Sequence, residues 1–306
     1  MSNIGSSYSQ IIQPEDYNRI MTEEHLYIST SDMYIAKKIK ELTQPAAEVV
    51  ELGCGPARVL SLISENQEIN LTAIELDEGF LEYAKKLVKN PNVSFINEDV
   101  ENYQHSKPVD IFYSQGFHHH IQKGQKTANY LKNIYDNLKD GGYYIISDEF
   151  IPNYTDDNDR EIKIVIWYSH IIANAIKRGF SYLAQEESKT LLDDLYEGRT
   201  TANIKSPEQI DFTLSKVTAI DNAARGGDLE TAITLAKEFL TQLESYYNIT
   251  FHDDTTIDLT RGDFKVCESV LRKEAEMANF HVESIRSFGP IETIGAMSVY
   301  LLKKIA

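Results

Sequence analysis

The first half of the chain alternates short apolar runs with longer stretches in which apolar residues recur at helical spacing. Apolar runs of four or five residues that end in an acid or a small polar residue are typical of buried strands. Because strands that alternate with helices build βαβ units, the pattern predicts a parallel sheet covered by helices on both faces. The expected strands are 49–52, 71–75, 93–96, 109–113 and 143–147, and the expected helices are 14–44, 59–65, 79–89 and 126–138.

The pattern changes after the fifth expected strand. Helical periodicity takes over from residue 156 to about residue 248, and the chain then returns to one helix and two strands. We therefore expect an α/β fold in three parts: a core with N-terminal helices (1–155), a helical insertion (156–255) and a segment that completes the core (256–306). Expected in the second half are helices 157–178, 182–196, 207–224, 229–247 and 264–279, and strands 281–287 and 296–302.

Composition and charge narrow the possible partners. The 306 residues carry a net charge of −17 and show no Lys/Arg-rich run, which argues against a nucleic-acid partner. Cys54 and Cys267 form neither a disulfide framework nor a zinc spacing. Residues 1–10 lack the features of a secretory leader, and 164–176 is too short and too polar to span a bilayer. We expect a cytoplasmic monomer or homodimer with no membrane partner.

The clearest candidate for chemistry is a glycine turn that follows the first expected strand. It reads Glu51-Leu52-Gly53-Cys54-Gly55-Pro56-Ala57. Glycines let the backbone approach a ligand closely because no Cβ intervenes. The next two strands also end near acids, at Glu75 and at Glu98-Asp99. Three successive strands that end near acids predict a nucleotide-type ligand at this edge of the sheet.

This constellation resembles the class I S-adenosylmethionine (SAM)-dependent methyltransferases, whose first motif is an acid followed by x-Gly-x-Gly-x-Gly. Ala57 stands where the third glycine is common. The resemblance covers about residues 45–150 and resumes at about 260–306. It implies a Rossmann-like, doubly wound, mostly parallel seven-stranded sheet, with a helical lid inserted after strand five and one antiparallel strand in the closing hairpin.

The resemblance also implies SAM as the cofactor and S-adenosylhomocysteine as its product. Glu75 would accept both ribose hydroxyls, Asp99 and the Val100 N–H would meet the adenine, and the main chain near Ser114 would receive the methionine ammonium. The competing interpretations are solvated loop acids and a nicotinamide-binding fold, which wants a glycine where Arg58 stands. The predicted cofactor residues are Glu51, Gly53, Gly55, Glu75, Leu76, Asp99, Val100, Ser114 and Gln115.

A run of three histidines, His118-His119-His120, follows the fourth expected strand, and Asp148 ends the fifth. A His-His pair with an Asp at these places resembles a sugar-type natural-product O-methyltransferase subgroup. Imidazole, with a reference pKa of ~6.5, suits deprotonation of a hydroxyl near neutral pH. A carboxylate beside it would fix the tautomer. We therefore predict His119 as base, His120 as a substrate contact and Asp148 as the orienting group.

Two alternatives to this base assignment stay open. The histidines can serve structure alone, by bonding the backbone or capping the next helix. They can also bind a metal, with His118, His120 and Asp148 or Glu149 as ligands. Adjacent residues point apart in an extended segment, so at most two of the three histidines would share one ion. We expect no metal.

The helical insertion is expected to lie over the cleft and shape the acceptor pocket. Candidate substrate contacts are Tyr17, Glu149, Trp167 and His170, although the only tryptophan fits ordinary packing better. Together these features predict a methyltransferase that acts on a hydroxyl of a small-molecule acceptor. The alternatives are N-, C- or carboxyl-methylation by proximity, a macromolecular acceptor, and a SAM-binding homologue that transfers no methyl. The sequence names neither the acceptor nor its nucleophilic atom.

Overall fold

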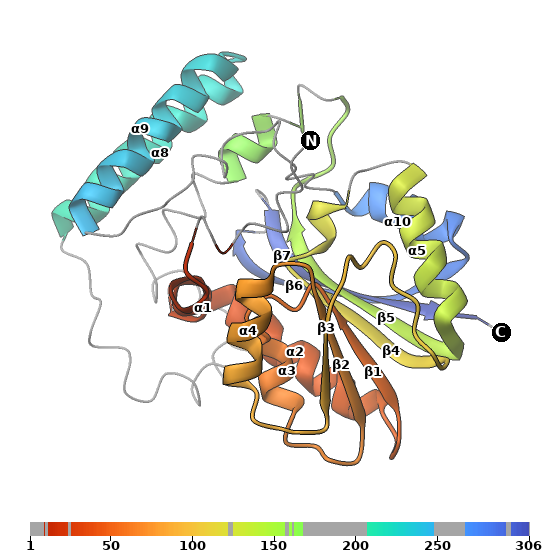
Figure 1. Ribbon diagram of the computed structural model, residues 1–306. Helices are drawn as coiled ribbons and strands as arrows, with labels where there is room; N and C mark the ends of the chain where they lie inside the picture. Colours follow the sequence, from red (N-terminus) through yellow and green to blue (C-terminus); the bar gives the residue numbers. More distant parts are fainter. Residues whose placement is uncertain are drawn as a thin grey trace.

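A seven-stranded sheet forms the centre of the computed structural model (Figure 1). The strand order is β3-β2-β1-β4-β5-β7-β6, and β7 runs antiparallel to both of its neighbours while the other pairs are parallel. The strands are β1 (Glu48–Leu52), β2 (Asn70–Glu75), β3 (Val93–Asn97), β4 (Val109–Gln115), β5 (Leu138–Phe150), β6 (Phe280–Ile291) and β7 (Gly295–Lys304). The structure describes residues 9, 12–23, 26–121, 125–156, 159–160, 162–167, 207–247, 267–291 and 295–305.

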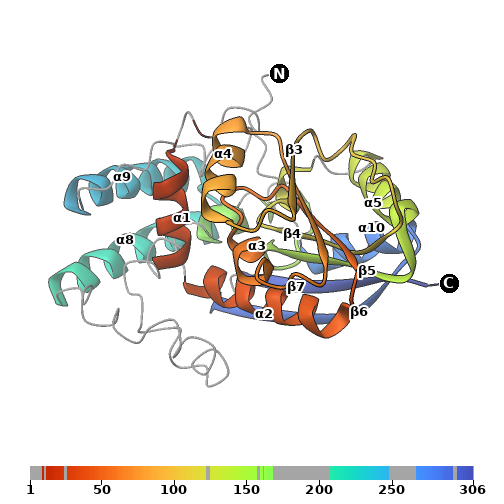
Figure 2. The same cartoon turned by 60° about the horizontal axis from the view of Figure 1, so that its bottom comes forward.

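Helices cover both faces of this sheet, as Figure 2 shows from a second direction. One face packs against α2 (Leu26–Leu42), α3 (Arg58–Ile63) and α4 (Glu78–Leu87) through a core that contains Ile39, Leu60 and Ala84. The other face packs against α5 (Gln125–Asn137) and α10 (Glu268–Met277). Helix α1 (Pro14–Glu23) lies against α2 and α4. Both faces of the sheet are therefore shielded from solvent, which explains why its strands consist of continuous apolar runs in the sequence.

The predicted α/β fold and all seven predicted strands are confirmed, with corrected boundaries. Strand β5 is longer than the expected 143–147, because it already pairs with β4 at Leu138. The β4–β5 register shifts between Leu138 and Tyr143, where Gly141 has φ 78°. The expected single helix 14–44 is two helices, α1 and α2. Asn279 adopts a left-handed conformation with φ 65° after α10, and this ends the helix before β6.

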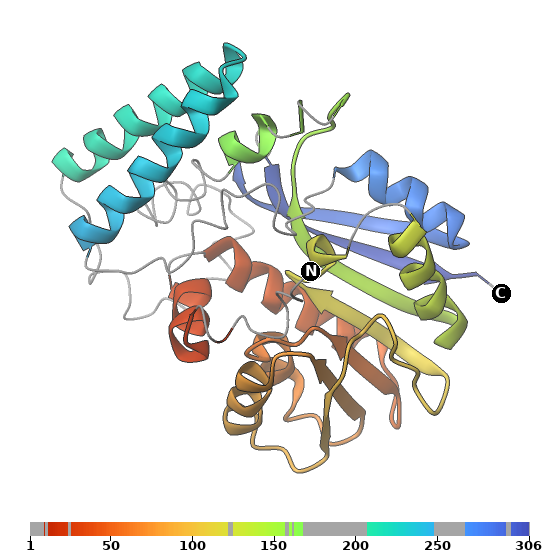
Figure 3. The same ribbon diagram turned by 45° about the horizontal axis from the view of Figure 1, so that its top comes forward.

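The chain between β5 and α10 contains two long helices, α8 (Pro207–Arg225) and α9 (Leu229–Tyr247). They lie side by side as a hairpin that stands apart from the sheet (Figure 3). Their apolar faces pack together and against Val165 and Ile166 of the segment that leaves β5. The expected helix 182–196 and most of the expected helix 157–178 lie outside the described residues.

The strand order indicates at which edge of the sheet a ligand would bind. The chain moves outward from β1 through β2 to β3, and then returns to add β4 and β5 on the other side. Ligands in such sheets bind beyond the carboxyl ends of the strands, where the order reverses. The ends of β1 and β4 lie at this point. In the described part of the chain, no helix has the length and apolar character that a membrane crossing needs.

Candidate active site

The glycine turn after β1 is folded tightly against the ends of β2 and β4. The Cys54 N–H donates to the Ile74 carbonyl at 2.9 Å. Gly53 has φ 65°, and a Cβ there would overlap the ring of Phe117, so only glycine fits. Gly55 has φ 50° and faces open space where a Cβ would stand. Ala57, at φ 59°, takes the left-handed conformation directly before α3, a conformation that glycine adopts most readily.

Glu75 at the end of β2 holds this turn from the side. Its carboxylate accepts the Gly55 N–H at 2.7 Å and the Asp77 N–H at 2.9 Å. Burial raises the pKa of Glu75 to about 6, although backbone hydrogen bonds from Asp77, Gly55 and Leu76 act to lower it. A single hydrogen bond therefore joins Glu75 to the glycine turn, in agreement with the sequence spacing.

The remaining predicted cofactor residues surround the same edge of the sheet. Leu76 follows Glu75, and its carbonyl accepts the Asn97 amide at 2.9 Å. Asp99 is half-buried and accepts the Glu101 N–H at 3.0 Å, while Val100 is buried. Residues Ser114 and Gln115 end β4. All these positions lie at or just beyond the carboxyl ends of β2, β3 and β4.

The carboxylate of Asp148 on β5 binds His119 twice. The His119 Nδ1 lies 2.7 Å from Asp148 Oδ1, and the His119 backbone N–H donates to Oδ2 at 2.9 Å. The Glu149 backbone N–H also donates to Oδ1, at 2.7 Å. Asp148 is fully buried, whereas 13% of the His119 side chain is exposed. The structure thus brings together the two residues that the sequence predicts as base and orienting group.

The three histidines form a 3₁₀ turn (His118–His120), so the expectation that they lie in an extended segment is wrong. The turn places the His119 and His120 rings 4.0 Å apart between centroids, instead of on opposite sides. His120 is exposed. His118 is fully buried, with its Nε2 3.9 Å from the Glu274 carboxylate of α10. This burial favours a structural role for His118.

Comparison with known proteins agrees with this geometry. A family model described as a methyltransferase domain matches residues 49–142, which include the glycine turn, Glu75, Asp99 and the histidines. The sheet order, with one antiparallel strand next to the edge, is the arrangement that the class I resemblance implies. Residues 49–142 thus form a methyltransferase domain of the class I, SAM-dependent type. SAM is accordingly its cofactor, and the protein is an enzyme.

The relatives of this methyltransferase are distant. Malonyl-[acyl-carrier protein] O-methyltransferase 2 of Ilyobacter polytropus is 20% identical over 224 residues, which cover 72% of this chain and 82% of that protein. Malonyl-[acyl-carrier protein] O-methyltransferase 1 of the same organism is 33% identical over 92 residues, or 29% of this chain and 34% of that protein. The structure of a Listeria monocytogenes protein described as a putative SAM-dependent methyltransferase covers 88% of this chain and 97% of its own, at 15% identity and a TM-score of 0.46.

Sequence reasoning missed a buried ion pair beside the methyltransferase's glycine turn. Arg58, the first residue of α3, donates to Asp32 of α2 at 2.9 Å and also to the Gln115 side chain of β4. Both charged side chains are over 90% buried. One signal was available, because Asp32 falls on the same helical stripe as the buried Ile28 and Ile35. A charge on an apolar stripe predicts a buried partner.

The candidate substrate contacts are spread over several elements. The Tyr17 ring on α1 lies 6.0 Å from the Arg58 guanidinium. The Tyr27 hydroxyl donates to Glu149 at 2.9 Å. Trp167 is fully buried in a cluster with Tyr27 and Met297, a position that favours packing over substrate contact. His170 lies outside the described residues. Among the residues that the structure describes, no group of three or more His, Cys, Asp or Glu is placed to hold a metal.

Glu51 gives this methyltransferase a testable dependence on pH. Burial raises the pKa of Glu51 to about 8, from 4.5, although Tyr113 and Arg58 act to lower it. From about pH 4.5 to pH 8 the unfolded chain has lost a proton that the folded protein keeps, so the free energy of unfolding falls as pH rises. Glu51→Gln cannot ionise. We therefore compare the free energy of unfolding of Glu51→Gln with that of the wild type. The difference, variant minus wild type, should rise by on the order of 3–5 kcal/mol as the pH rises from about 4.5 to 8.

Urea denaturation at pH 5, 6.5 and 8 measures this difference. A difference that stays constant with pH would show that the folded protein does not hold a proton on Glu51.

Proposed function

We propose that the enzyme transfers the methyl group of SAM to a hydroxyl of a small-molecule acceptor, with His119 as the base and Asp148 as the group that orients it. The observation that carries this proposal is the Asp148–His119 pair, joined at 2.7 Å through Nδ1 and at 2.9 Å through the backbone. A pair with this geometry is what a neutral hydroxyl requires, because that nucleophile must lose a proton.

The chemistry follows from the pairing. SAM supplies an electrophilic methyl group on its sulfonium. Asp148 accepts the Nδ1–H of His119, which leaves the lone pair of the neutral ring on Nε2. The hydroxyl proton of the acceptor moves to Nε2 of His119 as the acceptor oxygen bonds to the methyl carbon and the carbon–sulfur bond breaks. The buried Asp148 charge then stabilises the imidazolium. His120, whose ring lies 4.0 Å from the His119 ring between centroids, is assigned to contact the acceptor.

The residues around the glycine turn fit SAM. Gly55 and Gly116, at φ 50° and 63°, both face open space where a Cβ would stand, so a ligand can approach their backbone. The Glu75 carboxylate is fixed by two backbone hydrogen bonds and retains further lone pairs for two ribose hydroxyls. We assign to the cofactor Glu51, Gly53, Gly55, Glu75, Leu76, Asp99, Val100, Ser114 and Gln115.

A second candidate acceptor comes from the relatives. The names of the two Ilyobacter polytropus proteins point to an acyl group carried by acyl-carrier protein. A free carboxylate is already ionised at neutral pH and needs no base. This chain, however, pairs the His119 imidazole in the turn after β4 with the Asp148 carboxylate of β5, and a carboxylate acceptor would leave this pair without a role. The hydroxyl acceptor therefore explains more of the site.

The cofactor assignment predicts weaker SAM binding for Glu75→Ala. Two charge-assisted hydrogen bonds to the ribose would be lost, so the binding free energy should weaken by about 1–3 kcal/mol in calorimetry. The control is Glu78→Ala, which removes an exposed acid three residues further along the chain. Unchanged affinity in a folded Glu75→Ala protein would contradict the assignment.

The base assignment predicts that His119→Ala lowers turnover of a hydroxyl acceptor by roughly 10²–10⁴, the usual cost of losing a general base. Turnover of the wild type should rise with pH as the ring loses its proton, and Asp148→Asn should slow it through the wrong tautomer. The measurement is label transfer from methyl-labelled SAM to a panel of hydroxylated small molecules and to malonyl-acyl-carrier protein.

The control for this experiment is His281→Ala, because His281 is exposed on the edge strand β6. If the wild type methylates malonyl-acyl-carrier protein and His119→Ala retains full activity, the acceptor is a carboxylate and the base assignment is wrong. A loss of activity with chelator that a divalent ion restores would make the histidines metal ligands.

A further inference from the structure

Asp77, the residue before α4, joins Ser9 to the core. Its Oδ2 accepts the backbone N–H of Ser9 at 2.7 Å. Its Oδ1 accepts the backbone N–H of Phe80 at 3.0 Å and so caps α4. Asp77 is only 1% exposed. A buried carboxylate is stable only when its lone pairs are satisfied, and here one of the donors comes from 68 residues away.

The same residue is bonded to the acid that we assign to the cofactor. The Asp77 backbone N–H donates to Glu75 Oε1 at 2.9 Å, and Glu75 Oε2 accepts the Gly55 N–H at 2.7 Å. Ser9, Asp77, Glu75 and the glycine turn therefore form one continuous set of contacts. Displacement of Ser9 would leave Asp77 with an unsatisfied buried oxygen directly beside Glu75.

Gly79 is the residue that permits this approach. A Cβ at Gly79 would lie 2.6 Å from the Cβ of Ser9 and 2.5 Å from its hydroxyl. Gly79 lies in the first turn of α4, where glycine is less favourable than alanine by roughly 0.5–1 kcal/mol. No positive φ requires glycine at this position. The close packing of Ser9 supplies the physical reason for it.

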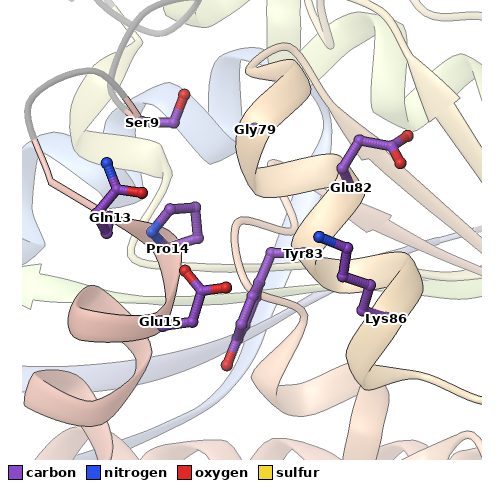
Figure 4. Close-up of a pocket in the computed structure, with 8 residues that line it drawn as sticks. All are labelled: Ser9, Gln13, Pro14, Glu15, Gly79, Glu82, Tyr83 and Lys86. Atoms are coloured by element: carbon purple, nitrogen blue, oxygen red, sulfur yellow. The ribbon is translucent and has the colours of Figure 1, made fainter.

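A pocket of about 290 Å³ lies beside this bond, between α4 and the start of α1. Figure 4 shows its lining side chains on α4, at the start of α1 and on the residues before α1. Further along α1, the Tyr17 ring contacts Phe80 edge to face at 5.4 Å, and the Asn18 amide donates to Tyr83 at 3.3 Å. A hollow interface loses dispersion contacts, so single hydrogen bonds matter more here. The pocket is lined by Ser9, Gln13, Pro14, Glu15, Gly79, Glu82, Tyr83 and Lys86.

We propose that Asp77 is a positioning residue for the cofactor: the Ser9 N–H fixes its side chain, its own N–H fixes Glu75, and loss of the Ser9 contact speeds the departure of the cofactor. The proposal rests on the assignment of Glu75 to the cofactor. It makes Ser9, Asp77 and Gly79 determinants of cofactor retention, although none of them is assigned a contact with the cofactor.

Two variants break the contact in different ways. Ser9→Pro removes the backbone N–H that Asp77 accepts, whereas Ser9→Ala keeps it. Gly79→Ala displaces Ser9 and leaves both acids in place. The probe is S-adenosylhomocysteine, with its dissociation rate measured by stopped-flow displacement and its affinity by calorimetry. Glu78→Ala is the control on α4, and thermal unfolding of each ligand-free protein reports stability.

We expect Ser9→Pro and Gly79→Ala to speed dissociation about tenfold, the equivalent of one charge-assisted hydrogen bond. Ser9→Ala should have a much smaller effect. The melting temperature of ligand-free Gly79→Ala should change little, because the gain from a helix-favouring alanine offsets the lost Ser9 hydrogen bond. A purely structural role would lower the melting temperature without changing the dissociation rate.

Unchanged dissociation in Ser9→Pro and Gly79→Ala would overturn the proposal, as would equal effects of Ser9→Pro and Ser9→Ala. In either case, weaker binding by Glu75→Ala would leave the cofactor assignment standing. If Glu75→Ala binds S-adenosylhomocysteine as tightly as the wild type does, the cofactor assignment fails first, and the inference fails with it.

Discussion

The acceptor end of the site depends on one buried carboxylate. Asp148 receives donors from the His119 ring, the His119 backbone and the Glu149 backbone, and it is fully buried. An ionised carboxylate at such a position is tolerated only with this degree of satisfaction. The hydrogen bonds to Asp148 therefore hold the 3₁₀ turn against β5. The position of this turn then decides which nitrogen of His119 faces away from the carboxylate. The same hydrogen bonds to Asp148 thus position the turn and orient the proposed base.

The cofactor end follows the same principle with different partners. Arg58 and Asp32 neutralise each other beneath the glycine turn, and Gln115 takes a further hydrogen bond from the guanidinium. Because removal of either charge would leave the other buried and unpaired, this pair ties α2, α3 and β4 into one unit. Asp77 does the same for the loop after β2, where backbone groups are its donors. Polar side chains, rather than further apolar packing, thus fix the edge of the sheet where the ligands are expected.

The sequence contains enough information for the sheet and for the His119–Asp148 pair. The strands were predictable because both faces of the sheet are covered, and each strand therefore appears as an apolar run. The pair was predictable because two strand ends meet at one edge. The close approach of the His119 and His120 rings was missed, because a short 3₁₀ turn has no periodic signal. The Arg58–Asp32 and Ser9–Asp77 contacts were missed because they join residues 26 and 68 positions apart through single side chains.

If Asp148 sets the tautomer of His119, the long-range ¹H–¹⁵N NMR spectrum of the imidazole nitrogens shows it. The His119 signals are assigned by their loss in His119→Gln. Above the pH at which the ring becomes neutral, we expect a proton on Nδ1 and a bare Nε2, with this preference lost in Asp148→Asn. A neutral His119 that carries its proton on Nε2, or a tautomer that Asp148→Asn does not alter, would show that Asp148 does not orient a base.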